Sequence, residues 1–231
     1  MDIAVVRYLG DYMFPRVCHI CGCSLTRRER YVCGACMSRM PHTLYHLKPD
    51  TNFMCQRFIG RFPFVRATGI FFYSRDNDLS VLMHDLKYHR YRGLARYLGE
   101  VAATEVFPSG FLSDIDGLMP VPMHFMKRAR RGYNQTEEIS KGMSLICGLP
   151  VLNNLQASRR HNTQTKMTLE ERQKNTAGIF RVDRPGELDG KHILLVDDVC
   201  TTGSTLTSAA DILLAACPGV KLSMLTLGVT F

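Results

Sequence analysis

The chain has 231 residues, of which 45% are hydrophobic and 22% are charged, and its net charge is +8 at pH 7. This composition is that of a globular protein that can bury a sizeable core, and it excludes a disordered or low-complexity chain. The positive charge favours anionic partners such as phosphates, nucleic acid or an acidic protein surface.

The N-terminal segment does not have the pattern of a signal peptide, and no run is long and apolar enough to span a bilayer. Residues 1–15 instead carry an apolar stripe at helical spacing, formed by Ile3, Val6, Leu9 and Met13. We favour a helix that docks on its own protein, because a helix on a membrane surface usually has a more basic polar face. We therefore expect a cytoplasmic protein without membrane insertion.

Most of the cysteines gather near the N-terminus. The chain has nine, and five of them lie between Cys18 and Cys36. Cys18 and Cys21 form one pair with two intervening residues, and Cys33 and Cys36 form another. This spacing lets both thiolates of a pair reach one metal ion, and two pairs complete a tetrahedron. An odd cysteine total argues against a secreted disulfide framework. We expect a structural zinc ion on these four thiolates, with no position open to water.

The chain divides into three parts on the basis of these patterns. Residues 1–45 form an N-terminal helix and the cysteine knuckle, and a small module of this kind needs its metal to fold. Residues 46–63 contain prolines and little periodicity, which is typical of a linker with some local structure. Residues 64–231 have the pattern of an α/β domain.

Strands and helices alternate from residue 64 onward. The apolar runs predict strands over 64–73, 118–121, 151–157, 180–182, 192–199 and 221–229. The helical periodicity predicts helices over 79–91, 93–107, 134–147 and 202–217. This order predicts a mostly parallel, twisted sheet that is flanked by helices and connected by right-handed crossovers.

One stretch of this domain carries most of the chemistry. The buried-strand pattern of residues 193–196 is followed directly by Asp197 and Asp198, and then by a loop rich in hydroxyl groups. The loop amides and the N-terminus of the next helix form a phosphate cradle, and Gly203 lets a phosphate approach the backbone. The cradle consists of Cys200, Thr201, Thr202, Gly203, Ser204 and Thr205. Adjacent carboxylates suit the diol of a sugar, so we expect a sugar phosphate as the ligand.

The stretch from Val196 to Thr205 resembles the phosphoribosyl pyrophosphate (PRPP) motif of type I phosphoribosyltransferases. A second segment, Pro120–Pro122 followed by Lys127–Gln135, is similar to the matching part of the ComF family, also called ComF/GntX-type proteins. The four-cysteine knuckle carries the same resemblance. The resemblance therefore implies a type I phosphoribosyltransferase fold with a small N-terminal zinc-binding module.

The resemblance also implies roles for individual residues. Asp197 and Asp198 would take the ribose hydroxyls of PRPP and act in catalysis, and the cradle would hold the 5-phosphate. The pyrophosphate loop would contain Val121, Pro122 and Met123, and pyrophosphate would be neutralised by Arg128, Arg131 and a magnesium ion. A mobile loop would close over the site with Arg159, Arg160, Gln164 and Lys166.

Two functions remain open at this stage. In the first, the protein is an enzyme that transfers or hydrolyses the phosphoribosyl group with release of pyrophosphate and is linked to DNA uptake in natural transformation. In the second, it is a non-catalytic competence factor that handles single-stranded DNA beside a helicase, and its PRPP pocket is a sensor or a relic. Nothing in the sequence identifies an acceptor for the ribose.

A basic run bears on the second function. Lys87, Arg90 and Arg92 alternate with Tyr88 and Tyr91, which suits stacking on single-stranded DNA. The same pattern is typical of an amphipathic helix end whose long side chains extend to solvent, and we favour that interpretation.

Overall fold

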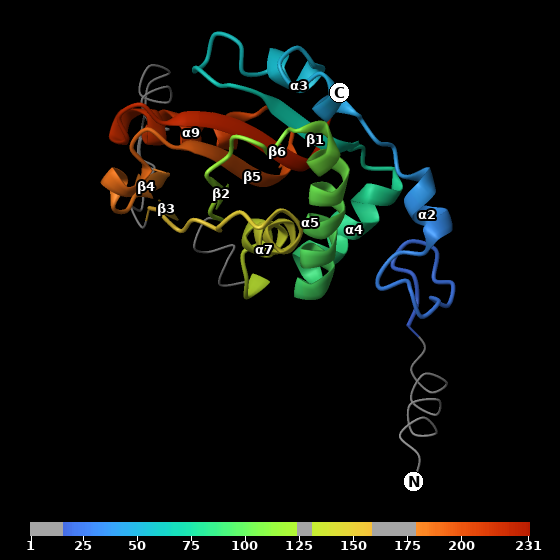
Figure 1. The fold of residues 1–231 in the computed structure, drawn as a ribbon. Helices are drawn as coiled ribbons and strands as arrows, with labels where there is room; N and C mark the ends of the chain where they lie inside the picture. The colour runs from blue at the N-terminus through green and yellow to red at the C-terminus, as the bar shows by residue number, and fades with distance from the viewer. Residues whose placement is uncertain (1–15, 124–130, 159–178) are drawn as a thin grey trace, which may run out of the picture.

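The computed structural model describes residues 16–123, 131–158 and 179–231. Its centre is a parallel sheet of four strands in the order β1-β6-β5-β2 (Figure 1). The strands are β1 (Ala67–Phe72), β2 (Gly117–Pro120), β5 (His192–Cys200) and β6 (Lys221–Val229). A single parallel bridge from Leu118 to Val151 extends the β2 edge. The predicted α/β class with a mostly parallel sheet is confirmed.

Helices cover both faces of this sheet (Figure 1). One face packs against α4 (Asp78–Tyr88), α5 (Arg92–Val106) and α7 (Gln135–Cys147). The other face packs against α3 (Phe53–Gln56), α9 (Ser204–Ala216) and the hairpin of β3 (Leu155–Ala157) and β4 (Phe180–Val182). Short 3-10 helices lie at Tyr45–Leu47, Phe107–Ser109 and Pro185–Leu188.

The side chains of β5 explain why residues 193–196 of this strand are all apolar. Leu194 and Val196 belong to the hydrophobic cluster on the α4–α5–α7 face, whereas Ile193 and Leu195 belong to the cluster on the opposite face. All four are fully buried. Side chains alternate between faces along a strand, so a stretch covered on both sides favours apolar residues at every position. The polar residues therefore begin where the cover ends, at Asp197.

Helices α5 and α7 pack closely because two glycines lie at their crossing. A Cβ atom on Gly99 would lie 2.0 Å from the carbonyl oxygen of Ile139, and one on Gly142 would lie 1.9 Å from that of Arg96. Neither position has room for a side chain. This close approach fixes the start of α7 relative to the sheet.

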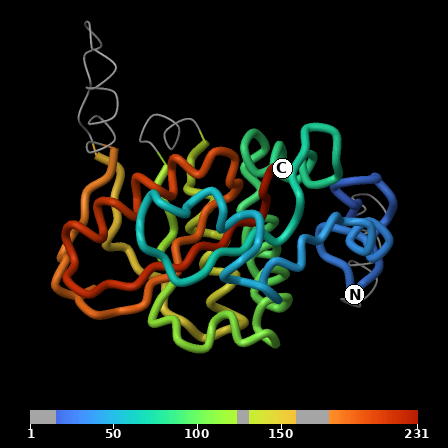
Figure 2. The backbone as a smooth tube through the Cα atoms, turned by 90° about the horizontal axis from the view of Figure 1, so that it is seen from above, coloured from blue at the N-terminus to red at the C-terminus, as the bar shows by residue number. Residues whose placement is uncertain are grey.

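The cysteine knuckle lies to one side of the sheet (Figure 2) and ends in α2 (Gly34–Arg39). Cys18, Cys33 and Cys36 are buried in the same hydrophobic cluster as the inner face of α4. The knuckle is therefore packed directly onto the α/β domain.

The segment predicted as a linker, residues 46–63, also packs onto the domain. It contains α3, and its Met54, Cys55 and Phe58 side chains are fully buried in the cluster that includes Ile193 and Leu195. Over the residues described, no helix has the length and apolarity that crossing a membrane requires.

Candidate functional site

Two carboxylates lie at the carboxyl end of β5. The backbone amide of Asp198 donates to Oδ1 of Asp197 at 2.8 Å, and the amide of Val199 donates to Oδ1 of Asp198 at 2.7 Å. Each carboxylate is thus held by the amide that follows it. In an open parallel sheet, this edge is where ligands bind.

The environment of Asp197 changes its titration. Burial raises the pKa of Asp197 well above its ordinary value, and the neighbouring Asp198 raises it further, while Lys87 opposes the shift. A raised carboxyl pKa in a cavity is typical of a functional site, because folding alone gains nothing from it.

The predicted cradle follows the acids as a tight loop. Gly203 has a φ of 77°, and a Cβ atom there would lie 2.8 Å from Cε1 of Phe58. Glycine is therefore required both by the backbone conformation and by the packed ring. The loop leads into α9, and the N-terminal end of a helix favours an anion. Burial raises the pKa of the Cys200 thiol to about 11, so this thiol stays neutral.

A cavity of about 320 Å³ joins these elements. It is lined by both aspartates, by Thr205 at the start of α9 and by Arg131 from the segment before α7. The residues expected in the pyrophosphate loop line it as well, namely Val121, Pro122 and Met123. The structure thus brings together residues from three separate parts of the sequence.

Two residues that line this cavity each carry a buried polar atom without a partner among the described residues. The atoms are Nε of Arg131 and Nε2 of Gln135. The other end of each side chain is held, since Nη1 of Arg131 donates to Oε1 of Gln135 at 2.9 Å. Buried donors without acceptors are costly, and an anion in the cavity would satisfy them.

The segment that carries Arg131 is braced on both sides. Oγ1 of Thr136 donates to the carbonyl of Val121 at 2.7 Å, and the hydroxyl of Tyr133 donates to the carbonyl of Leu86 at 2.8 Å. Arg92 donates to the carbonyl of Gly132 at 2.9 Å. These bonds connect the segment to the residue after β2, to α4 and to the start of α5.

The basic run of the sequence analysis is divided by the fold. Lys87 lines the cavity with the two aspartates, whereas Arg92 is bonded to Gly132 and lies 5.6 Å from the ring of Tyr133. Arg90 has a left-handed backbone with a φ of 58°, and its side chain lies beside Gly132. Arg90 and Arg92 thus lie together beside Gly132, whereas Lys87 lines the cavity.

Two arginines near the cradle were missed by sequence reasoning. Arg57 donates to the carbonyl of Thr230 at 2.6 Å, and Arg61 donates to the carbonyl of Thr202 at 3.0 Å. Both lower the pKa of Cys200 electrostatically against the effect of burial. The two arginines are four residues apart, which would place them on one face of a helix. The segment has no apolar stripe, so its sequence did not predict a helix there.

The four cysteines predicted as metal ligands lie together. The sulfur atoms of Cys18, Cys21, Cys33 and Cys36 are within 4.8 Å of one another. The backbone amide of Cys23 lowers the pKa of the Cys21 thiol to about 6, so a thiolate is present at neutral pH. Four thiols at this spacing fit a tetrahedral zinc ion.

Several predicted residues lie outside the described ranges. These are the N-terminal stripe of residues 1–15, Arg128 and the four residues of the expected mobile loop, Arg159, Arg160, Gln164 and Lys166.

Comparison with known proteins adds to this geometry. A family model described as "Phosphoribosyl transferase domain" matches residues 109–225, which is just over half of the chain. "Competence protein F" of Haemophilus influenzae is 28% identical over 202 residues, which cover 83% of this chain and 82% of that protein. "DNA utilization protein YhgH" of Escherichia coli K12 is 29% identical over 204 residues, which cover 86% and 84% of the two chains.

A solved structure, that of "the allosteric regulatory enzyme of purine biosynthesis", aligns with a TM-score of 0.41 at 18% identity. The alignment covers 56% of this chain and 25% of the length of that enzyme.

Proposed function

Because this chain belongs to the phosphoribosyl transferase domain family, we propose that it binds PRPP at the carboxyl end of β5 and transfers or hydrolyses its phosphoribosyl group with release of pyrophosphate. The fold is the type I phosphoribosyltransferase fold, and the predicted resemblance to ComF-type proteins is confirmed by relatives along most of the chain.

One observation carries this proposal: unpaired donors and paired acids line the same cavity. Arg131 and Gln135 line it, and each has a buried nitrogen, Nε and Nε2, without a partner among the described residues. Asp197 and Asp198 form another part of its wall. PRPP carries an anionic pyrophosphate and a ribose diol on neighbouring carbons. The donors suit the first group and the carboxylates suit the second.

A mechanism follows from these contacts. The bond between the anomeric carbon and the pyrophosphate oxygen breaks, its electron pair leaves on pyrophosphate, and positive charge develops on the ribose ring. Arg131 and Lys87 stabilise the negative charge of the leaving group. Asp197 and Asp198 hold the ribose hydroxyls and offset the charge on the ring. Water attacks in hydrolysis, and an acceptor attacks in transfer.

Two metal ions fit the donor groups. Magnesium suits pyrophosphate oxygens together with carboxylates such as those of Asp197 and Asp198, and when bound it would neutralise the leaving group. Zinc suits Cys18, Cys21, Cys33 and Cys36, and it would hold the knuckle in its folded form. Free thiols of this kind favour a reducing compartment, so we also propose a cytoplasmic location.

Release of pyrophosphate from PRPP with magnesium, followed by a coupled phosphate assay, tests turnover. We expect release by the intact protein and loss of about two orders of magnitude in an Arg131→Met variant, because removal of one transition-state donor has that cost. If the intact protein releases no pyrophosphate, with or without candidate acceptors, the proposed catalysis is wrong and only PRPP binding remains.

A role in DNA use is the second candidate, and it rests on the names of the relatives, "Competence protein F" and "DNA utilization protein". In this function the protein handles single strands beside a helicase, and PRPP acts as a signal. Binding of a single-stranded oligonucleotide at several salt concentrations tests it, since contacts to phosphates weaken as salt rises. A variant in which Lys87, Arg90 and Arg92 are neutralised should bind the oligonucleotide more weakly. Unchanged affinity would mean that these residues do not bind single-stranded DNA.

A further inference from the structure

A second group of metal-ligating side chains lies at the C-terminal end of α4. It consists of His84, Asp85 and His89, which the proposed function does not use. One ring nitrogen of each histidine and one carboxylate oxygen of Asp85 lie within 4.8 Å of one another. Among the described residues, the four cysteines of the knuckle meet the same limit. The three side chains are therefore close enough to share one ion.

The end of the helix brings the two histidines together. Asp85 and His89 are four residues apart, so they lie on one face. Residues five apart on a regular helix point roughly 140° away from each other, which would separate His84 from His89. However, α4 ends at Tyr88, and His89 is the cap residue that follows it. The ring centroids of His84 and His89 lie 5.5 Å apart, with an angle of 72° between the ring planes.

The carboxylate of Asp85 forms the base of this group. Its side chain is 14% exposed, whereas the side chain of His89 is 54% exposed and His84 is also exposed. Oδ1 of Asp85 lies 2.9 Å from Nδ1 of His89, and Oδ2 lies 2.6 Å from Nδ1 of His19. One oxygen thus faces the end of α4, and the other faces the cysteine knuckle.

These distances suit an ion on the Oδ1 side of Asp85. Zinc lies about 2.0–2.2 Å from nitrogen and oxygen ligands, so neighbouring ligand atoms around it are about 3.0–3.5 Å apart. The 2.9 Å between Oδ1 and Nδ1 of His89 is close to that spacing. Oδ2 keeps its contact with His19, and an outer contact of this kind orients a metal ligand.

Ion pairing alone explains only part of the group. It accounts for His19 and His89 on either side of Asp85. It does not account for His84, which has ring contacts to Tyr88 and His89 but no hydrogen bond or ion pair to a described residue. An imidazole nitrogen that no protein group occupies is available to a metal ion.

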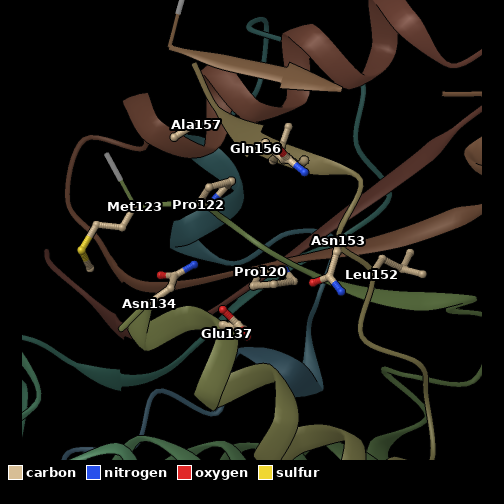
Figure 3. Close-up of a pocket in the computed structure, with 10 residues that line it drawn as sticks. Pro120, Pro122, Met123, Asn134, Glu137, Leu152, Asn153, Gln156 and Ala157 are labelled. Carbon is tan, nitrogen blue, oxygen red and sulfur yellow. The ribbon is translucent and has the colours of Figure 1, made fainter. Parts of the chain in front are cut away.

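The cavity in Figure 3 fits such an ion less well. It measures about 600 Å³, and Asn134 and Glu137 at the start of α7 lie across it from Gln156 of β3. Its lining residues offer one carboxylate, with neither an imidazole nor a thiol. A transition-metal ion prefers nitrogen or sulfur ligands to amide oxygens.

Glu105 also lies between two histidines. Nδ1 of His42 is 2.6 Å from Oε2 of Glu105, and Nδ1 of His46 is 3.6 Å from Oε1. Their ligand atoms do not all lie within 4.8 Å of one another, so these three residues do not share one ion. They provide a comparison for the group on α4.

We propose that His84, Asp85 and His89 bind a divalent transition-metal ion, with water in the remaining position. Imidazole nitrogens favour ions such as zinc and nickel, whereas magnesium and calcium prefer oxygen ligands. The ion joins the last turn of α4 to the residue that follows it, and the Asp85–His19 contact links the ion to the knuckle. The inference does not depend on PRPP binding.

Titration of cobalt(II) into the intact protein tests this inference. Dialysis comes first, because an ion on three ligands at an exposed site exchanges with solvent, whereas four thiolates retain zinc. Magnesium is kept in excess to occupy sites made of carboxylates alone, such as Asp197 and Asp198. We expect one further equivalent of cobalt to bind, with visible d–d absorption and without the charge-transfer absorption of a cobalt thiolate.

His84→Asn and His89→Asn should each weaken cobalt binding by more than about tenfold, since even a change in the outer shell of a metal site costs that much. Both histidines are exposed, so the variants should fold and keep the zinc of the knuckle. Circular dichroism and metal analysis measure these two properties.

His42→Asn is the matched control, because His42 also contacts a carboxylate but lies outside the group. It should bind cobalt as the intact protein does. The inference fails if no further cobalt binds in excess magnesium, or if the bound cobalt has thiolate absorption. It also fails if His84→Asn and His89→Asn bind cobalt as tightly as His42→Asn.

Discussion

Nδ1 of His19 lies 2.6 Å from Oδ2 of Asp85, and this contact ties the cysteine knuckle to α4. Burial alone would raise the pKa of Asp85, but hydrogen bonds from His19 and His89 hold it below its ordinary value. Asp85 lies two residues before Lys87, which lines the cavity of about 320 Å³ together with the two aspartates. The knuckle therefore supports the helix that carries a residue of the site.

Loss of the metal ligands should weaken both the knuckle and the site. We expect about one zinc ion per chain in the intact protein and none in a Cys33→Ser variant. The variant should also unfold at a lower temperature, because Cys33 is buried against the core. Metal analysis and calorimetry measure both effects.

Cys23→Ser is the matched control, since Cys23 is exposed and lies outside the four-sulfur cluster. It should retain zinc. Equal zinc content in the Cys33→Ser and intact proteins would contradict the assignment of the knuckle.

The acid pair should impose a cost on the stability of the free protein. The folded state raises the pKa of Asp197 above that of the unfolded chain, so the folded protein binds more protons. The free energy of unfolding therefore falls as pH rises from about the ordinary carboxyl value of 3.8 through the raised pKa of Asp197.

Asp197→Asn removes this penalty, so it should raise the denaturation midpoint near neutral pH while PRPP binding is lost. Urea unfolding at several pH values measures the effect. If the variant is less stable, or if the pH dependence of unfolding is unchanged, the charged form of Asp197 does not destabilise the free protein.

The cradle loop should not tolerate a side chain at Gly203. Its left-handed backbone costs an alanine about 1–2 kcal/mol, and the added methyl group would displace the ring of Phe58. We expect Gly203→Ala to lower both stability and PRPP affinity.

Gly186→Ala provides the comparison, because its added Cβ would meet nothing within 4 Å and its φ is not positive. It should leave stability and PRPP affinity near those of the intact protein. Equal effects of the two substitutions would mean that the loop conformation is not what binds the phosphate.

Lys87 should contribute to PRPP binding. Lys87→Met keeps the aliphatic stem and removes the charge that faces Asp197, so affinity for PRPP should fall about tenfold. Lys191→Met, in the turn before β5, is a control outside the cavity. Calorimetry measures the affinity of each variant for PRPP. Equal affinities of the two variants would mean that Lys87 does not contribute to PRPP binding.

Much of the fold follows from the sequence because its strands are apolar runs with clear ends. The strands predicted over 180–182 and 221–229 have the observed bounds, and the strand predicted over 192–199 extends one residue further to Cys200. The strand predicted over 151–157 is shorter, since only Leu155–Ala157 pair in the hairpin and Val151 forms a single bridge. A short edge element leaves little periodicity to mark its start.

The site was less predictable because two of its parts depend on tertiary contacts. Lys87 reaches the aspartates from the end of a helix, and nothing in the alternation of bases and tyrosines around it indicates that direction. Arg57 and Arg61 approach the cradle from a segment whose packing depends on single buried residues such as Phe58. Local sequence patterns cannot show which distant strand end such a segment will contact.

Calorimetric titration of PRPP with magnesium into the intact protein and into an Asp197→Asn/Asp198→Asn double variant tests the central claim most directly. We predict that the intact protein binds PRPP at one site and that the double variant, while still folded, shows no binding heat. Undiminished binding by the double variant would contradict the assignment of the ribose to the carboxyl end of β5.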